Sequence, residues 1–490
     1  MSNHLFPAMV SKSPLASRFP LPVLVIVFAL ILVLVPRAAL AANYTWINSG
    51  GGFWTGNTAA REASYGTPTP GSSGPLGTDN LAMTSASSLA LQNSGATLSG
   101  GLNRAINTLS STVAGANIAS GATSADVGFT SLTVNGDITV SNSGNSLTFF
   151  NSTAAPTTAG AMTVSVAGNV TIAAGTSLYL GLIQDTGVPT GGNNYGSYLN
   201  GFTANSTEVG KGQVNVDGKL MLNRNTTAVT LGDVNVGAAG VVTLTGAGAS
   251  DTAHSGTFNK TIQARSLTGS GIVENSIVVS GTGSASSTAT LVLNTLATTD
   301  ATFSGILRDG SGTDAVLNVT VSGSGQQRFT GDNTYSGTTL VSAGTLLIDG
   351  AQSGAGLVTV ESGGTLGGSG SIAGSLNLLA GADFVFSLTE TLTVNGDTVS
   401  FGGFGISNLI GLDSSVDLGT YTLINGTATF DFTNVLNFGA ENAVSLGGGK
   451  SAYFQAGSFQ VVVVPEPTSA LLLLMGAASF WATRRRFRRA

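Results

Sequence analysis

The chain has 490 residues, of which only 9% are charged, 69 are glycine and none is cysteine. The lack of cysteine excludes disulfides, thiol catalysis and thiolate metal sites. Ten of the 18 basic residues and 23 of the 24 acidic residues lie between Asn43 and Val464, so this span carries a net charge of −13. An acidic body repels a phosphate backbone, which argues against nucleic acid as a partner.

Residues 1–41 have the composition of a helical export signal peptide. Lys12 and Arg18 precede the apolar run from Leu21 to Val35, and Ala39 and Ala41 are the small residues of the expected cleavage site. The mature chain is therefore expected to start near Ala42. A retained membrane anchor is the alternative, because the apolar run is long for a signal.

Residues 42–88 are interpreted as an N-terminal cap followed by a loop. Trp46 and Trp54 lie here among glycines. Such an aromatic cluster is able to cover the open end of a solenoid, whose first coil otherwise exposes its core. A platform on which sugar rings stack is the functional alternative.

Residues 89–379 alternate short apolar runs with turn residues, as in Leu132 to Val140 and Val358 to Val360. Val, Ile and Thr are abundant and no stretch has an amphipathic helical period, so the pattern predicts β-strands. Asn-Gly and Asp-Gly pairs also occur in hairpins, which leaves some antiparallel pairing open. The segment Asp185 to Glu208 is expected to loop out of the stack.

The segment from Phe329 to Gly350 reads as turn, strand, turn, strand. Ala343-Gly344-Thr345-Leu346 recurs twenty residues later as Gly363-Gly364-Thr365-Leu366. Self-similarity at such a period is typical of a solenoid.

The sequence GDNTYSGTTLVSAGTLLIDG, which ends at Gly350, resembles the autotransporter-associated β-strand repeat, also called the passenger-associated transport repeat. The resemblance implies a right-handed parallel β-helix in an exported surface protein. About 290 residues at roughly 20 to 25 per coil would give a rod on the order of 60 Å long. The repeat positions are occupied by Gly331, Asn333, Tyr335, Gly337, Thr339, Val341, Gly344, Thr345 and Leu346.

Residues 380–464 are richer in phenylalanine and are expected to form a small C-terminal β domain that caps the stack. The strands Tyr421 to Ile424 and Phe459 to Val464 are expected to be antiparallel. The segment Gly419 to Phe432 resembles the module that often closes proteins of this repeat family. A separate ligand-binding sandwich is the alternative.

Residues 465–490 begin with Pro465, Glu466 and Pro467. The apolar run Ala470 to Trp481 follows, and Thr468 to Thr483 is expected to form a hydrophobic helix of about 24 Å. A basic cluster then holds the end in the cytoplasm by the positive-inside rule; it consists of Arg484, Arg485, Arg486, Arg488 and Arg489.

These three parts in this order resemble the PEP-CTERM sorting signal of bacterial exported proteins. The resemblance implies that an exosortase-type membrane enzyme recognises Pro465, Glu466 and Pro467 and processes the tail. An ordinary membrane anchor made by the C-terminal helix is the alternative. A self-secreting autotransporter is not expected, because its C-terminus would consist of amphipathic barrel strands.

Few residues suggest chemistry. His254 is the one histidine beyond the signal, and no nucleophile elbow accompanies it. Aspartates occur singly at turns, where turn formation explains them. A calcium site between Arg308 and Asp314 is a weak alternative, since Thr320 stands where an EF-type loop has its closing glutamate. We assign no catalytic residue, no metal site and no cofactor.

The sequence thus predicts an all-β protein that is exported and found at the cell surface or in the extracellular matrix. Its expected role is structural and adhesive, with a surface polysaccharide as the expected ligand. The alternative is a polysaccharide-binding or polysaccharide-degrading β-helix, which would need carboxylates gathered on one face.

Overall fold

The computed structural model describes most of the chain beyond residue 41, and the described residues belong to one compact unit. They are 42–466 without the segments 48–51, 56–64, 66–77, 86–87, 94–102, 121–130, 152–161, 182–200, 206–210, 224–225, 227, 247–255, 277–284 and 311–313, together with 475–479 and 481.

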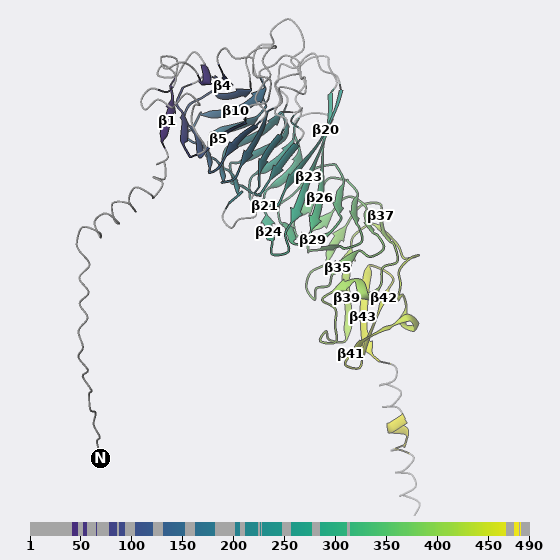
Figure 1. Cartoon of the computed structure of the whole chain (residues 1–490). Coiled ribbons are helices and arrows are strands. Elements are labelled where there is room, and N and C mark those ends of the chain that lie inside the picture. The colour runs from purple at the N-terminus through teal and green to yellow at the C-terminus, as the bar shows by residue number, and fades with distance from the viewer. Residues whose placement is uncertain are drawn as a thin grey trace, which may run out of the picture. The chain divides into compact units, whose positions relative to one another are not determined.

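The longest sheet, sheet A, has 14 strands, and every neighbouring pair in it is parallel (Figure 1). In order they are β1 (Asn43–Trp46), β3 (Asn80–Met83), β6 (Thr108–Ser111), β9 (Ile138–Val140), β12 (Val170–Ile172), β15 (Val214–Val216), β18 (Asp233–Val236), β21 (Ser266–Gly269), β24 (Asp300–Phe303), β27 (Gln326–Phe329), β29 (Gly344–Ile348), β32 (Gly364–Gly367), β35 (Asp383–Val385) and β38 (Leu409–Ile410).

Sheet B has nine parallel strands and ends partway along the stack. They are β2 (Gly52–Thr55), β4 (Ser88–Asn93), β7 (Ala116–Ser120), β10 (Ser146–Asn151), β13 (Ser177–Leu180), β16 (Lys219–Asn223), β19 (Val241–Gly246), β22 (Ile272–Asn275) and β25 (Ile306–Asp309).

Sheet C has 13 parallel strands and accompanies sheet A along most of its length. They are β5 (Asn103–Ile106), β8 (Ser131–Val134), β11 (Thr163–Val166), β14 (Gly201–Ala204), β17 (Ala228–Leu231), β20 (Gly256–Ala264), β23 (Ala285–Thr295), β26 (Ala315–Gly323), β28 (Thr339–Val341), β31 (Val358–Val360), β34 (Leu376–Leu378), β37 (Thr398–Phe401) and β40 (Thr429–Asp431).

Sheet D has seven strands and combines both kinds of pairing. β30 (Ala351–Gln352), β33 (Ser371–Ile372), β36 (Leu392–Val394) and β39 (Gly419–Asn425) are parallel, whereas β43 (Phe459–Pro465), β42 (Lys450–Gln455) and β41 (Val444–Gly447) continue the sheet antiparallel. The short helical turns are η1 (Ile406–Asn408), η2 (Ala440–Asn442) and an α-helical stretch at 475–479.

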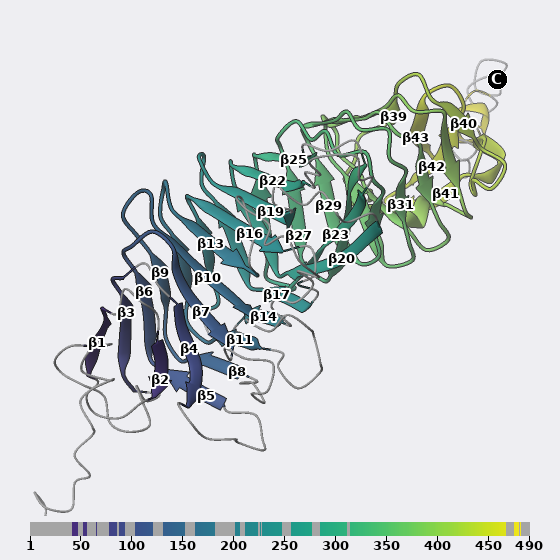
Figure 2. The ribbon, with the colours of Figure 1, turned by 90° about the horizontal axis from the view of Figure 1, so that it is seen from above.

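From β5 to β25 the chain visits the sheets in the order C, then A, then B, coil after coil (Figure 2). From β28 onward sheet D takes the place of sheet B. The strands β8, β9 and β10 form one such coil, and β11, β12 and β13 form the next, directly stacked on it. This is a parallel β-solenoid, as the sequence predicts. Parallel crossovers are almost always right-handed, and the right-handed sense of the coil stays a prediction.

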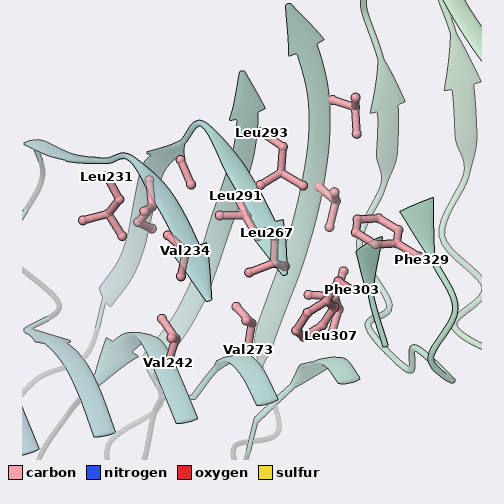
Figure 3. Packing of buried hydrophobic residues seen from close by; sticks show 14 of the residues in the cluster. Leu231, Val234, Val242, Leu267, Val273, Leu291, Leu293, Phe303, Leu307 and Phe329 are labelled. Carbon is pink, nitrogen blue, oxygen red and sulfur yellow. The ribbon is translucent and has the colours of Figure 1, made fainter. Parts of the chain in front are cut away.

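The core lies between the sheets and is built from alternate residues of each strand. In β9, Ile138 and Val140 are buried and Thr139 points outward. Figure 3 shows the inner side chains of three sheets converging, with Val234, Leu267, Phe303 and Phe329 from sheet A, Val242, Val273 and Leu307 from sheet B, and Leu231, Leu291 and Leu293 from sheet C.

Coil length varies much more than the sequence suggests. Near the repeat, Gly344 lies opposite Gly364, which is 20 residues along the chain, but Val170 lies opposite Val214, which is 44 residues along. The expectation of 20 to 25 residues per coil is therefore right for some coils, including the one from Val214 to Val234, and wrong for others. The 14 strands of sheet A nevertheless span roughly 60 Å at about 4.8 Å per strand spacing.

Three further expectations have clear outcomes. Tyr421 lies opposite Val461 in an antiparallel pair, so the predicted antiparallel strands are confirmed. Asn135-Gly136 lies at a bend between strands of different sheets and makes no hairpin, because the flanking strands pair with other coils. Residues 201–204, expected in a loop, form β14 with Phe202 buried; the rest of that predicted loop lies almost wholly outside the described residues.

A buried glutamine supplies hydrogen bonds where the backbone ladder of sheet A is interrupted. Strands β21 and β24 are paired only at Gly269 and Phe303. The N–H and the carbonyl of Leu267 therefore have no ladder partners in β24. The Gln327 side chain reaches from β27 past the small Ala301 side chain. Its Oε1 accepts from the Leu267 N–H at 3.1 Å, and its Nε2 donates to the Leu267 carbonyl at 2.8 Å.

Replacing Gln327 with alanine is expected to lower the free energy of unfolding by about 2 to 3 kcal/mol, because two buried backbone groups of Leu267 lose their partners. The matched control is Gln326→Ala, which removes only an exposed bond to Asp300 and is expected to cost less than about 0.5 kcal/mol. Urea unfolding followed by circular dichroism measures both. Equal small losses would mean that β21 and β24 close without the glutamine.

Candidate functional site

The glycines of the repeat let consecutive coils touch through their backbones. A Cβ on Gly331 would lie 1.9 Å from the carbonyl oxygen of Gly305, and one on Gly337 would lie 2.1 Å from that of Leu317. Gly344 has a φ of +69°, which side chains rarely tolerate. These three positions are therefore fixed by packing within the stack.

Asn333 connects sheet B to sheet D. Its Oδ1 accepts from the Leu307 N–H of β25 at 2.9 Å, and its Nδ2 donates to the Gly331 carbonyl at 3.2 Å. Its backbone forms a parallel bridge to Gln352 of β30. The buried asparagine thus stands where a sheet B strand would otherwise lie in this coil.

Tyr335 is the centre of a buried polar triangle. Its hydroxyl lies 2.6 Å from Thr339 Oγ1 and donates to Gln352 Oε1 at 2.9 Å, and Gln352 Nε2 donates to Thr339 Oγ1 at 3.1 Å. All three side chains are buried. Burial raises the pKa of Tyr335 to about 12.

The remaining repeat positions complete the core. Leu346 is buried between Gln327 and Leu366 of the neighbouring coils, and Val341 is buried in sheet C. The predicted repeat residues thus lie together in one coil, and most of their side chains point inward. They form a structural site that holds the coils together, so a ligand-binding surface has to be sought among the outward residues.

Two residues important to this coil are absent from the motif. Gln352 completes the triangle, and Gln327 bonds the interrupted part of sheet A. No recognisable motif in the local sequence around either glutamine marks it as structurally important. The available sequence signal is an amide at a position where alternation demands an apolar residue, as in Gln327 between Gln326 and Arg328.

Asp309, one of the two aspartates in the weak calcium alternative, accepts hydrogen bonds from the backbone. Asp309 Oδ1 accepts from the Leu317 N–H at 2.7 Å and Oδ2 accepts from the Ser336 N–H at 2.8 Å. Arg308 pairs with Glu274 at 2.6 Å. Among the described residues no three His, Cys, Asp or Glu side chains gather as metal ligands, and His254 lies outside them.

The side chains of Asp233 and Lys260 also have shifted pKa values. Asp233 bonds Arg265 at 2.5 Å and Ser266 at 2.7 Å, and hydrogen bonding from Arg265 is the main cause that lowers the pKa of Asp233. Lys260 is buried, and desolvation lowers its pKa to about 7. Neither arrangement groups the carboxylates that a glycosidase requires.

Trp46 is buried in the first coil of the stack. Its ring is 0% exposed and lies 5.1 Å from the Tyr65 ring in an edge-on contact. An enclosed indole offers no face to a sugar, so the stacking alternative is wrong for Trp46. The side chain of Trp54 lies outside the described residues.

The first two residues of the predicted sorting signal belong to the folded body. Pro465 ends β43 opposite Lys450, and the Glu466 N–H donates to the Gly449 carbonyl at 2.8 Å. The Glu466 carboxylate accepts from the Ser445 hydroxyl.

The other predicted targeting residues, namely Ala39, Ala41, Pro467 and the five arginines from Arg484 to Arg489, lie outside the described residues. In the portion of the chain that is described, no helix is both long and apolar enough to cross a membrane.

Tyr335→Phe is expected to lower the free energy of unfolding by about 1 to 3 kcal/mol, because Thr339 and Gln352 each lose a buried partner. Tyr421→Phe is the control, since its hydroxyl donates to Asp417 at an exposed site. Urea titration of both variants makes the comparison, and equal effects would contradict the structural role of the triangle.

The same two variants, Tyr335→Phe and Tyr421→Phe, test how the titration of Tyr335 affects stability. The folded-state pKa of about 12 lies above the ordinary value of 10.0, so the stabilisation is fully present below pH 10 and is lost as the pH rises toward 12. The wild-type chain and the Tyr421 variant should lose this part of their stability over that range, and the Tyr335 variant should not.

Comparison with known protein families identifies a repeat in this coil. The model of the passenger-associated-transport-repeat family matches residues 319–348. The chain is also 52% identical over 64 residues to the adhesin BmaC autotransporter of Brucella suis biovar 1 (strain 1330), a match that covers 13% of this chain and 2% of that adhesin. The chain therefore contains a passenger-associated transport repeat within a parallel β-solenoid.

Proposed function

We propose that the chain is an exported, non-catalytic adhesive protein of the cell surface or the extracellular matrix. The proposal is carried by the coil at 319–348, which matches the passenger-associated-transport-repeat model and whose motif residues serve packing. The 64-residue similarity to an autotransporter adhesin supports it. A rigid stack of this kind presents long outward sheet faces, and a surface polysaccharide is the ligand class that we propose for them.

The polysaccharide-degrading alternative lacks a specific observation in its favour. Such an enzyme needs at least two carboxylates placed about a glycosidic bond. In the described part of the chain, Asp233, Glu274 and Asp349 each pair with an arginine from a different coil. Those carboxylates are engaged in holding coils together.

Targeting is a second part of the proposal. We propose that residues 1–41 are removed as a signal peptide near Ala39 and Ala41, and that Pro465, Glu466 and Pro467 are recognised by an exosortase-type enzyme. The hydrophobic segment and the arginine cluster would hold the tail in the membrane until then. Support comes from the position of Pro465 at the end of β43, the last described strand.

Adhesion is tested by deleting the gene in the native cells and restoring it on a plasmid. Attachment to polysaccharide-coated surfaces is expected to fall on deletion and to return with the full chain, because the stack supplies the contact surface. Attachment is counted under constant flow. The matched control restores Thr139→Ala, a single outward change on sheet A. Unchanged attachment after deletion would contradict the adhesive role.

Targeting is tested by mass spectrometry of the native protein after separation of membrane and extracellular material. We expect a new C-terminus near Pro465 and the body outside the cell, since processing would release the stack. Replacing Pro465, Glu466 and Pro467 with alanine should retain the tail. An intact tail ending at Ala490 in the wild-type membrane fraction would exclude processing and leave a permanent anchor.

A further inference from the structure

From β8 to β37, the outward face of sheet C differs from the outward faces of sheets A and B in having no charge. Each strand contributes two outward positions on either side of a buried one, as in Ser131-Leu132-Thr133 of β8. We call the resulting pair of rows the sheet C outer face. From β8 to β23 the first row is Ser131, Thr163, Gly201, Ala228, Thr261 and Thr290, and the second is Thr133, Ser165, Thr203, Thr230, Gln263 and Val292.

Both rows stay uncharged farther along the stack. The second row continues in register through Thr320, Leu340, Thr359, Asn377 and Ser400. Neither row contains Lys, Arg, Asp or Glu between β8 and β37. Eleven consecutive strands therefore present only hydroxyl, amide and apolar groups in these two rows.

The other long faces carry charges in the same coils. On sheet A, Asp300 is exposed and Asp233 and Arg328 are half-buried. On sheet B, the ion pair between Glu274 and Arg308 lies on the outside. The absence of charge is thus specific to sheet C and does not follow from the low charge of the whole chain.

Four hydroxyl groups of the second row are available to a ligand. Ser165 and Thr203 are exposed and Thr133 and Thr230 are half-buried, and no side-chain hydroxyl of these four has a hydrogen bond to another described residue. Rows repeat every 4.7 to 4.9 Å, roughly, across the strands, and the two rows lie about 6.6 Å apart along each strand. The parallel backbone ladder holds this array rigid.

We propose that the sheet C outer face binds an extended, uncharged polysaccharide laid across the strands. A neutral face in a body of net charge −13 disfavours anionic polymers. A ligand that engages the whole face has to offer hydroxyl groups repeatedly along its length, and a glycan chain does so sugar by sugar. The inference rests on the proposed adhesive function and specifies its surface and ligand.

Two other occupants fit less well. An ice lattice matches a periodic hydroxyl array, but Gly201, Ala228 and Val292 interrupt the hydroxyls of this one. A second copy of the chain would pair two hydroxyl-rich faces with little apolar area to bury, which supplies little driving force for association.

The experiment compares two triple variants of the full chain. Thr133→Val, Thr203→Val and Thr230→Val remove three hydroxyls from sheet C and keep the shape and strand preference of each residue. Thr139→Val, Thr171→Val and Thr302→Val do the same on sheet A, where these residues also face outward. Each protein is sedimented with microcrystalline cellulose, with insoluble β-1,3-glucan and with calcium alginate as the anionic polymer.

We expect the wild-type chain to sediment with at least one neutral polysaccharide and not with alginate. The sheet C variant should bind about tenfold more weakly, and the sheet A variant should stay within about twofold of wild type. Thr203→Arg, which places a long charged side chain in the middle of the face, should also weaken binding, whereas Thr171→Arg should not.

Several results would overturn the proposal. One is that the wild-type chain binds neither neutral polysaccharide, and another is that the two triple variants lose binding equally. The others are ice-growth inhibition that only the sheet C changes abolish, and a dimer that only those changes dissociate. The cell-attachment assay separates this from the broader function. If cells with the sheet C changes still attach, the proposed binding surface is wrong and the adhesive function stands. If the chain binds glycan but cells do not need it to attach, the adhesive function is wrong and the binding surface stands.

Discussion

The stack depends on the backbone hydrogen bonds that join each strand to the strands of the coils before and after it. Because these ladders are parallel and in register, a residue faces the residue at the same place in the next coil, as Thr139 faces Thr171. Inner positions must then stay apolar and outer positions polar over many coils. The alternation within three-residue strands, such as Ile138-Thr139-Val140, meets that demand with little sequence.

The same constraint explains the buried polar residues. Along most of the ladder the core contains Val, Leu, Ile and Phe. Where it is broken, at β21 and β24 or between sheets B and D, backbone groups lose their partners, and a buried unpaired group is costly. Gln327 and Asn333 supply the missing bonds at those two places. The repeat motif therefore marks the coil in which the cross-section changes.

The end of the stack uses a different solution. The last parallel strands are followed by three antiparallel ones, β41, β42 and β43, which continue sheet D. Phe401, Phe404, Phe432, Phe454 and Phe459 pack ring against ring beneath them, with centroids 4.5 to 6.2 Å apart. Large rings fill a space that short strands leave, and this covers the open end of the core.

Local pattern and a recognisable motif were enough to determine that the chain is all-β, that it forms a parallel solenoid and that Tyr421 to Ile424 pairs antiparallel with the last strand. Those features depend on alternation and turn residues that lie close together in sequence. The assignments for Ala39, Pro467 and the arginine cluster rest on sequence alone.

Only the tertiary structure decided the coil lengths, the change from sheet B to sheet D and the roles of Gln327 and Gln352. Each of these depends on contacts between residues 13 to 60 positions apart, which no local pattern reports. The uncharged face of sheet C is of the same kind. Thr133, Ser165 and Thr203 become neighbours only because coils of unequal length bring them into register.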